Sequence, residues 1–150
     1  MDELRELYQQ VILDHNKNPR NFGELANASH HAEGYNPLCG DRIHLFLRVA
    51  DNIIQDIRFT GQGCAISKAS ASIMTSLVKG KSTTQAQELF DKFLQLITSD
   101  PTQPVEVSGL DRLVVFAGVR EFPLRVKCAS LAWHTLKSAL SESGAVVTTE

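Results

Sequence analysis

Apolar side chains recur every three or four positions in several stretches of the chain. This spacing gathers them on one face of an α-helix, which is typical of a helix that packs against a core. The pattern predicts helices over residues 3–15, 65–79, 84–98 and 124–141. Residues 109–119 fit either a helix or a strand by periodicity, so both interpretations stay open there.

Apolar and polar residues alternate between positions 41 and 50, as in a strand with one buried face. The apolar positions of this strand are Ile43, Leu45, Leu47 and Val49. Asp51 and Asn52 then form a two-residue turn, and residues 53–60 return as the second strand of a hairpin. One side of the returning strand is expected to carry Ile53, Gln55, Ile57 and Phe59. A further strand is expected near residues 30–35.

These elements predict an α+β fold, in which a small antiparallel sheet of about three strands is covered by helices. A sheet of that size cannot bury its apolar face by itself, so the helices must cover it. The length of 150 residues fits a single domain over residues 1–150. Residues 1–3 and 143–150 are expected to be frayed, since chain ends are often poorly ordered.

The composition is that of an ordinary globular protein, with 43% apolar and 21% charged residues. The formal net charge of −2 argues against a dedicated nucleic-acid-binding protein, which needs clustered positive charge. No apolar run approaches the roughly 18 residues that a membrane-spanning helix needs, and the acidic first residues do not resemble a secretory signal. We therefore expect a cytoplasmic protein with neither nucleic acid nor membrane among its partners.

The chain contains 3 cysteines, an odd number that does not suit the disulfide framework of a short secreted protein. In a reducing cytosol the thiols are expected to be free. Each cysteine taken alone fits the role of a small buried apolar side chain. Their surroundings must therefore decide whether they have a chemical role.

Cys39 and Asp41 lie in a segment that is expected to be extended, so their side chains project to the same side. Gly40, between them, lets the backbone bend around a bound group. A thiolate and a carboxylate on one face form a pair that can bind a metal. The alternative is that Asp41 merely opens the following strand and Cys39 is buried.

Cys64 and Cys128 both fall near predicted helix starts. Backbone N–H groups and the helix dipole lower the pKa of a thiol at such a position. Arg125 and Lys127 add positive charge beside Cys128, which also favours the thiolate. The alternatives are a glycine-rich turn with a packed cysteine at Cys64 and ordinary solvated charge around Cys128.

Together the three thiols and Asp41 make a set of four ligands, which suits tetrahedral Zn²⁺ or an iron–sulfur cluster with some oxygen ligation. The spacing is not C-x-x-C, and the ligands come from three distant segments, so the fold must bring them together. The histidines are expected to be surface or hydrogen-bonded groups rather than ligands. They are His15, His30, His31, His44 and His134.

At these three segments the sequence resembles the IscU/NifU N-terminal family of iron–sulfur cluster assembly proteins, and its SufU branch in particular. The matching motifs read NPLCGD over residues 36–41, GQGCAIS over 61–67 and RVKCA over 125–129. Lys127 stands where IscU-type proteins carry histidine. The long interval between the second and third cysteines fits the extra segment of SufU-type proteins, expected within residues 98–120.

The resemblance implies an IscU/SufE-like sandwich and a sulfurtransferase-like carrier rather than a conventional enzyme. It implies zinc held by Cys39, Asp41, Cys64 and Cys128. Cys39 would take persulfide sulfur from a PLP-dependent cysteine desulfurase of the SufS type and pass it toward the Suf assembly machinery. Arg125 and Lys127 would help to bind this partner. The alternative is a scaffold that takes up iron and assembles a [2Fe–2S] cluster on the same four ligands.

Overall fold

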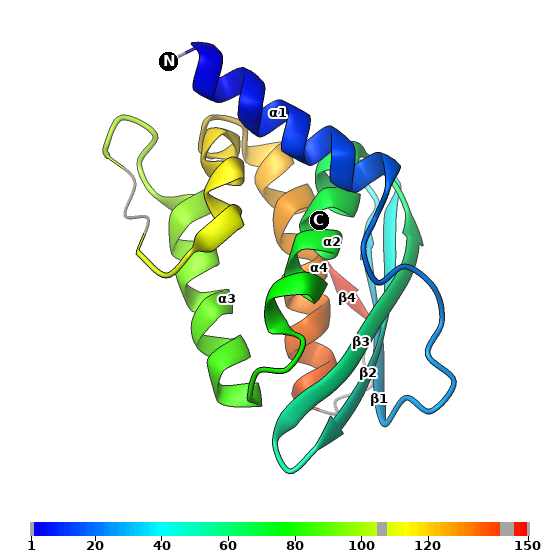
Figure 1. Ribbon diagram of the computed structural model, residues 1–150. Helices are drawn as coiled ribbons and strands as arrows, with labels where there is room; N and C mark the ends of the chain where they lie inside the picture. Colours follow the sequence, from blue (N-terminus) through cyan, green and yellow to red (C-terminus); the bar gives the residue numbers. More distant parts are fainter. Residues whose placement is uncertain (1, 105–107, 142–145, 150) are drawn as a thin grey trace.

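The computed structural model describes residues 2–104, 108–141 and 146–149. Its helices are α1 (Asp2–Lys17), α2 (Ala65–Val78), α3 (Thr83–Thr98), the 3₁₀ helix η1 (Asp111–Glu121) and α4 (Pro123–Ser141). Its strands are β1 (His30–Asn36), β2 (Asp41–Ala50), β3 (Ile53–Gln62) and β4 (Val147–Thr148). Figure 1 shows the sheet on one side of the molecule and the helices packed against one of its faces. The predicted α+β class is therefore confirmed.

The sheet has 4 strands in the order β3-β2-β1-β4, one more than expected. The first three are antiparallel neighbours, as predicted, whereas β4 pairs in parallel with β1. Val147 and Thr148, within the tail that is expected to fray, pair with Gly34 and Tyr35. Residues 142–145 and 150 lie outside the described residues. At the other end, α1 already begins at Asp2 rather than after a frayed segment.

The β2–β3 hairpin turns at Asp51 and Asn52, which both have positive φ angles, of 54° and 62°. Two such residues suit the tight turn that matches the twist of paired strands. The inward face predicted for β2 is confirmed. The prediction for β3 is wrong at Ile53 and Gln55, because a register shift opposite Arg48 and Val49 turns Ile54 inward instead. Such a bulge adds one residue to one strand, so the alternation of faces on one side of it does not continue on the other side.

The segment that fitted either a helix or a strand forms the 3₁₀ helix η1. Its buried apolar residues are Leu113, Val115, Phe116 and Val119. All but Val115 recur at every third position, and they continue the spacing from the buried N-cap Leu110. A 3₁₀ helix has three residues per turn, so this spacing gives it one buried face. Neither the α-helical nor the strand period describes the segment, which explains its ambiguity in the sequence.

Helix α2 is buried on most of its surface and packs against α1, β3 and α4. Its small residues allow this close approach, and Ser70 donates a hydrogen bond of 2.6 Å to the carbonyl oxygen of Ala129 in α4.

None of the helices in the described part of the chain is long and apolar enough to cross a membrane.

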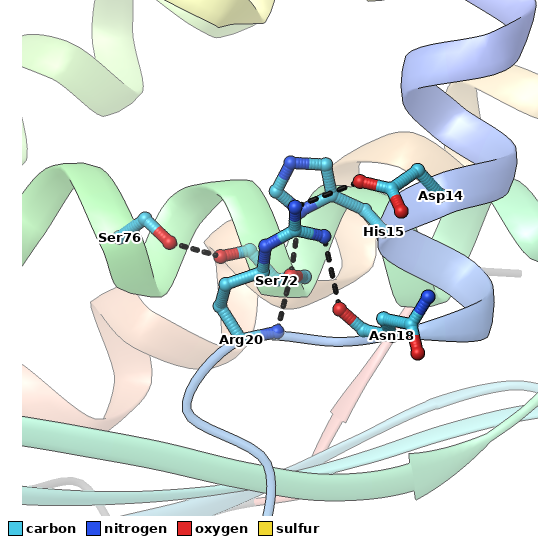
Figure 2. Close-up of polar contacts among 6 residues, drawn as sticks. All are labelled: Asp14, His15, Asn18, Arg20, Ser72 and Ser76. Atoms are coloured by element: carbon cyan, nitrogen blue, oxygen red, sulfur yellow. Dashed lines mark hydrogen bonds and ion pairs between the residues drawn. The ribbon is translucent and has the colours of Figure 1, made fainter.

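Ser72 fixes α1 and the segment after it to α2, as Figure 2 shows. Its hydroxyl lies 2.7 Å from Nδ1 of the buried His15 and accepts a 2.8 Å hydrogen bond from the backbone N–H of Arg20. The Arg20 guanidinium in turn pairs with Asp14 at 2.7 Å. The imidazole is 2% exposed, and burial, helped by the charge of Arg20, lowers its pKa below the usual 6.5.

This lowered pKa gives stability a pH dependence. Below about pH 6.5 the unfolded chain binds a proton at His15 that the folded protein resists, so the free energy of unfolding should decrease as the pH falls through this range. The variant His15→Gln should lose that part of the dependence, although His134, whose pKa burial also lowers, keeps a share of it. Urea unfolding of both metal-free proteins between pH 7.5 and 5 measures the two slopes. Equal slopes would show that His15 does not titrate in this way.

Candidate metal centre

The three cysteines and Asp41 meet where three parts of the fold come together. Cys39 lies in the turn between β1 and β2, and Asp41 is the first residue of β2. Cys64 is the N-cap of α2, whereas Cys128 lies in the second turn of α4, slightly deeper in its helix than expected. The structure thus brings together all four residues that the sequence singled out.

The potential ligand atoms of three of these residues are close enough to share one ion. Those of Cys39, Asp41 and Cys128 all lie within 4.8 Å of one another. The sulfur atoms of Cys39 and Cys128 are 3.3 Å apart, and that of Cys64 is 3.9 Å from Oδ2 of Asp41. In a tetrahedral zinc site with Zn–S bonds of about 2.3 Å, neighbouring sulfur atoms lie roughly 3.8 Å apart. The sulfurs of Cys39 and Cys128 and one carboxylate oxygen at this separation fit such an ion. Cys64 does not belong to this group of three, and its sulfur borders the group at the Asp41 carboxylate.

The start of α2 holds the carboxylate of Asp41. The backbone N–H of Cys64 donates a hydrogen bond of 2.8 Å to Oδ1 of Asp41. Gly63 makes room for this contact, because its φ angle is +145° and a Cβ atom there would lie 2.8 Å from the Cα atom of Asp41. A helix N-terminus stabilises a negative charge, so Asp41 can be fully buried as a carboxylate.

Cys64 and Cys128 differ in how readily they lose a proton, and all three cysteines differ in exposure. A hydrogen bond with Cys128 lowers the pKa of Cys64 to about 7, and the backbone N–H of Ser67 adds to this by donating to its sulfur at 3.4 Å. The same contact, together with burial, raises the pKa of Cys128. Cys64 therefore loses its proton more readily than Cys128 does. Cys39 is exposed, Cys64 half-buried and Cys128 buried.

Asn36 is a site residue that the sequence reasoning missed. It is the last residue of β1 and is fully buried. Its Nδ2 atom lies 3.3 Å from Oδ2 of Asp41 and 3.6 Å from the sulfur of Cys128. The signal was its place on the inward face of the strand, two positions after Gly34, where an apolar residue would be expected.

The exposed surface beside Cys128 combines apolar and basic side chains. Leu38, Phe122 and Leu124 are among the large apolar residues that remain exposed. Arg125 lies within one turn of Cys128 on α4, and its guanidinium carbon is 4.8 Å from the centre of the Phe122 ring. Lys127 directly precedes Cys128. Among the described residues, no histidine joins a group of three side chains that could bind a metal.

The chain is similar to a known domain family and to known proteins. The model of the NifU-like N-terminal domain matches residues 7–129. The chain is 40% identical to the zinc-dependent sulfurtransferase SufU of Bacillus subtilis (strain 168) over 93% of its own length and 92% of that protein. It is 39% identical to the iron–sulfur cluster assembly scaffold protein IscU of Streptococcus pyogenes serotype M1, over 95% of its length and 88% of that protein.

Solved structures agree with these similarities. A putative iron–sulfur cluster assembly scaffold protein for the SUF system from Fervidobacterium islandicum AW-1 superposes with a TM-score of 0.82 at 32% identity, covering 91% of this chain and 98% of that one. The N-terminal part of a NifU-like protein from Brucella abortus gives a TM-score of 0.80 at 21% identity, over 91% and 94% of the two chains. The second match, at this identity, supports the fold alone.

The role of Gly63 can be tested by the substitution Gly63→Ala. The added methyl group would push Asp41 away and strain the backbone, so we expect zinc affinity to fall by about 10–100-fold, as when other groups that orient metal ligands are lost, in a chelator competition titration. Gly80→Ala is the matched control, since its φ angle is +85° and a Cβ atom there meets nothing within 4 Å. Both variants should lose about 1–3 kcal/mol of stability from backbone strain. Equal zinc affinities would contradict the role of Gly63.

Proposed function

The chain belongs to the NifU-like N-terminal domain family and is an iron–sulfur cluster assembly protein of the IscU/SufU type, and we propose that it carries sulfur for this assembly. In this proposal it binds zinc and takes persulfide sulfur through Cys39. The observation that supports it best is the exposure of Cys39 within a group of otherwise shielded ligands. The name of the Bacillus subtilis relative, a zinc-dependent sulfurtransferase, describes the same chemistry.

Zinc would be held by Cys39, Asp41, Cys64 and Cys128. When bound, it keeps coordinating thiols deprotonated at neutral pH. The donor set fits, because two thiols and a buried carboxylate lie within reach of one ion and the Cys64 sulfur lies beside that carboxylate. Asp41 is a harder ligand than a thiolate, so this set should hold zinc less firmly than four cysteines would.

The sulfur donor would be a PLP-dependent cysteine desulfurase of the SufS type that carries a persulfide on its own cysteine. The thiolate of Cys39 attacks the outer sulfur of that persulfide. A new S–S bond forms at Cys39 as the S–S bond of the donor breaks, and the donor cysteine leaves as a thiolate. The exchange involves no net oxidation or reduction, and the sulfur can then pass to the Suf assembly machinery.

The surface beside the centre would guide this exchange. Exposed apolar groups at Leu38, Phe122 and Leu124 can contact a partner, and Arg125 and Lys127 can steer it by charge. Such charges act mainly on the rate of association. We place the reaction in the cytoplasm, where cysteine thiols stay reduced.

The substitution Cys39→Ser tests the acceptor role. Because Cys39 is exposed, the metal-free variant should keep its fold, with stability within about 0.5 kcal/mol of the metal-free unchanged protein. We expect it to abolish stimulation of the desulfurase, measured as alanine released from cysteine. Mass spectrometry of the unchanged protein should find the extra sulfur on the peptide that contains Cys39. Full stimulation by the variant would rule out Cys39 as the acceptor.

A cluster scaffold is the second candidate, favoured by the 39% identity to the IscU scaffold of Streptococcus pyogenes. Anaerobic incubation with iron and sulfide separates the two functions. The sulfur carrier should retain zinc and develop no stable visible chromophore. A chromophore that is then transferred to an apo-acceptor would favour the scaffold. Lys127 in place of the histidine of IscU-type proteins leads us to expect the first result.

A further inference from the structure

We infer that Asn36 is a positioning residue of the metal centre. Its buried amide fixes Asp41 and Cys128 relative to each other and thereby sets how firmly the centre holds a metal ion. The inference rests on the proposed function to the extent that these residues bind zinc. It does not depend on whether sulfur is transferred.

Asn36 contacts three of the four proposed ligand residues. Its backbone carbonyl oxygen accepts a hydrogen bond of 3.3 Å from the N–H of Cys39. Its side-chain Nδ2 donates to Oδ2 of Asp41 at 3.3 Å and to the sulfur of Cys128 at 3.6 Å. Asn36 and Asp41 also face each other across the β1–β2 ladder. One residue thus links the turn, the strand and helix α4.

The surroundings of the side chain determine which end of the amide faces the centre. An ionised carboxylate accepts hydrogen bonds and cannot donate them, so the NH₂ group must face Asp41. The opposite orientation would press a carbonyl oxygen against the carboxylate. In the observed orientation, Oδ1 of Asn36 is buried and finds no hydrogen-bond partner among the described residues. A buried acceptor without a hydrogen bond destabilises a protein. In this arrangement the NH₂ group contacts the two ligand residues, and the missing hydrogen bond at Oδ1 lowers stability.

A neutral amide suits this position because it serves both ligands without competing for the metal. A lysine would bring a positive charge that repels the ion, and an aspartate would set a second carboxylate against Asp41, whose repulsion would displace that ligand. An N–H group that donates to a ligand also fixes the orientation of that ligand. Loss of such groups typically lowers metal affinity by about 10–100-fold.

The experiment compares Asn36→Leu and Asn36→Asp with the unchanged protein. Both variants keep most of the volume of the side chain and its backbone hydrogen bonds, but neither has an NH₂ group. We expect zinc affinity to fall by about 10–100-fold in a competition titration with a chromophoric chelator. In the Co²⁺-loaded proteins the thiolate-to-metal charge-transfer band should move, because Cys128 loses a hydrogen bond at its sulfur.

A matched control is Ser72→Ala, which removes a buried hydroxyl from the contacts with His15 and Arg20. It should lower stability while leaving the zinc affinity and the Co²⁺ spectrum unchanged. In a double-mutant cycle, Asn36→Leu should lose most of its effect on affinity once Asp41→Ala is present, because the two side chains act together. Unchanged affinity and spectrum in both Asn36 variants would overturn the inference, as would a spectral change in Ser72→Ala equal to theirs.

The two proposals can fail separately. If the unchanged protein binds zinc and the Asn36 variants weaken it, the inference stands even when no desulfurase is stimulated. If the desulfurase is stimulated through Cys39 but the Asn36 variants bind zinc as tightly as the unchanged protein, the inference is wrong and the proposed function stands.

Discussion

The hydrogen bond from the backbone N–H of Cys64 to the carboxylate of Asp41 is the contact on which the centre depends. It joins the start of β2 to the start of α2. The first N–H groups of a helix have no partner within the helix, and the helix dipole favours an anion there. Asp41 satisfies one of these groups and can therefore be buried with its charge. Once it is fixed, the N-cap sulfur of Cys64 necessarily lies beside it.

The third segment is brought in by packing rather than by charge. Helix α4 approaches α2 closely because small side chains line α2. The hydrogen bond from Ser70 to the carbonyl of Ala129 fixes this approach one residue away from Cys128. Asn36 completes the arrangement from the sheet side. The position of Cys128 in the centre is thus set by the packing of α4 against α2.

Much of the fold could be predicted because its signals are local. The turn at Asp51 and Asn52 and the alternation along β2 were enough to identify the hairpin. The bulge that turns Ile54 inward has no such signal, because it depends on how β3 meets β2. The strand β4 depends on pairing with β1, which is far away in the sequence.

The sequence could predict which residues belong to the candidate centre, but not that they lie close together. Local sequence identified the cysteines and Asp41, because glycines and helix starts surround them. Their convergence depends on long-range packing, which no spacing rule describes. Asn36 was missed for a different reason. An asparagine before a proline resembles an ordinary turn residue, and its full burial becomes evident once helix α4 lies over the sheet.

The four side chains are held in place with different firmness, and this difference affects which of them can exchange a group. Asp41 is held by the N-terminus of α2, Cys64 by its place as N-cap, and Cys128 by burial in α4. Cys39 projects from a short exposed turn and has little packing to lose. A cation stabilises a buried cluster of anionic donors, so in the proposed function metal binding would be coupled to the folding of this corner. That coupling would be weakest at Cys39, where the proposed acceptor could take a sulfur atom while the other three side chains stay in place.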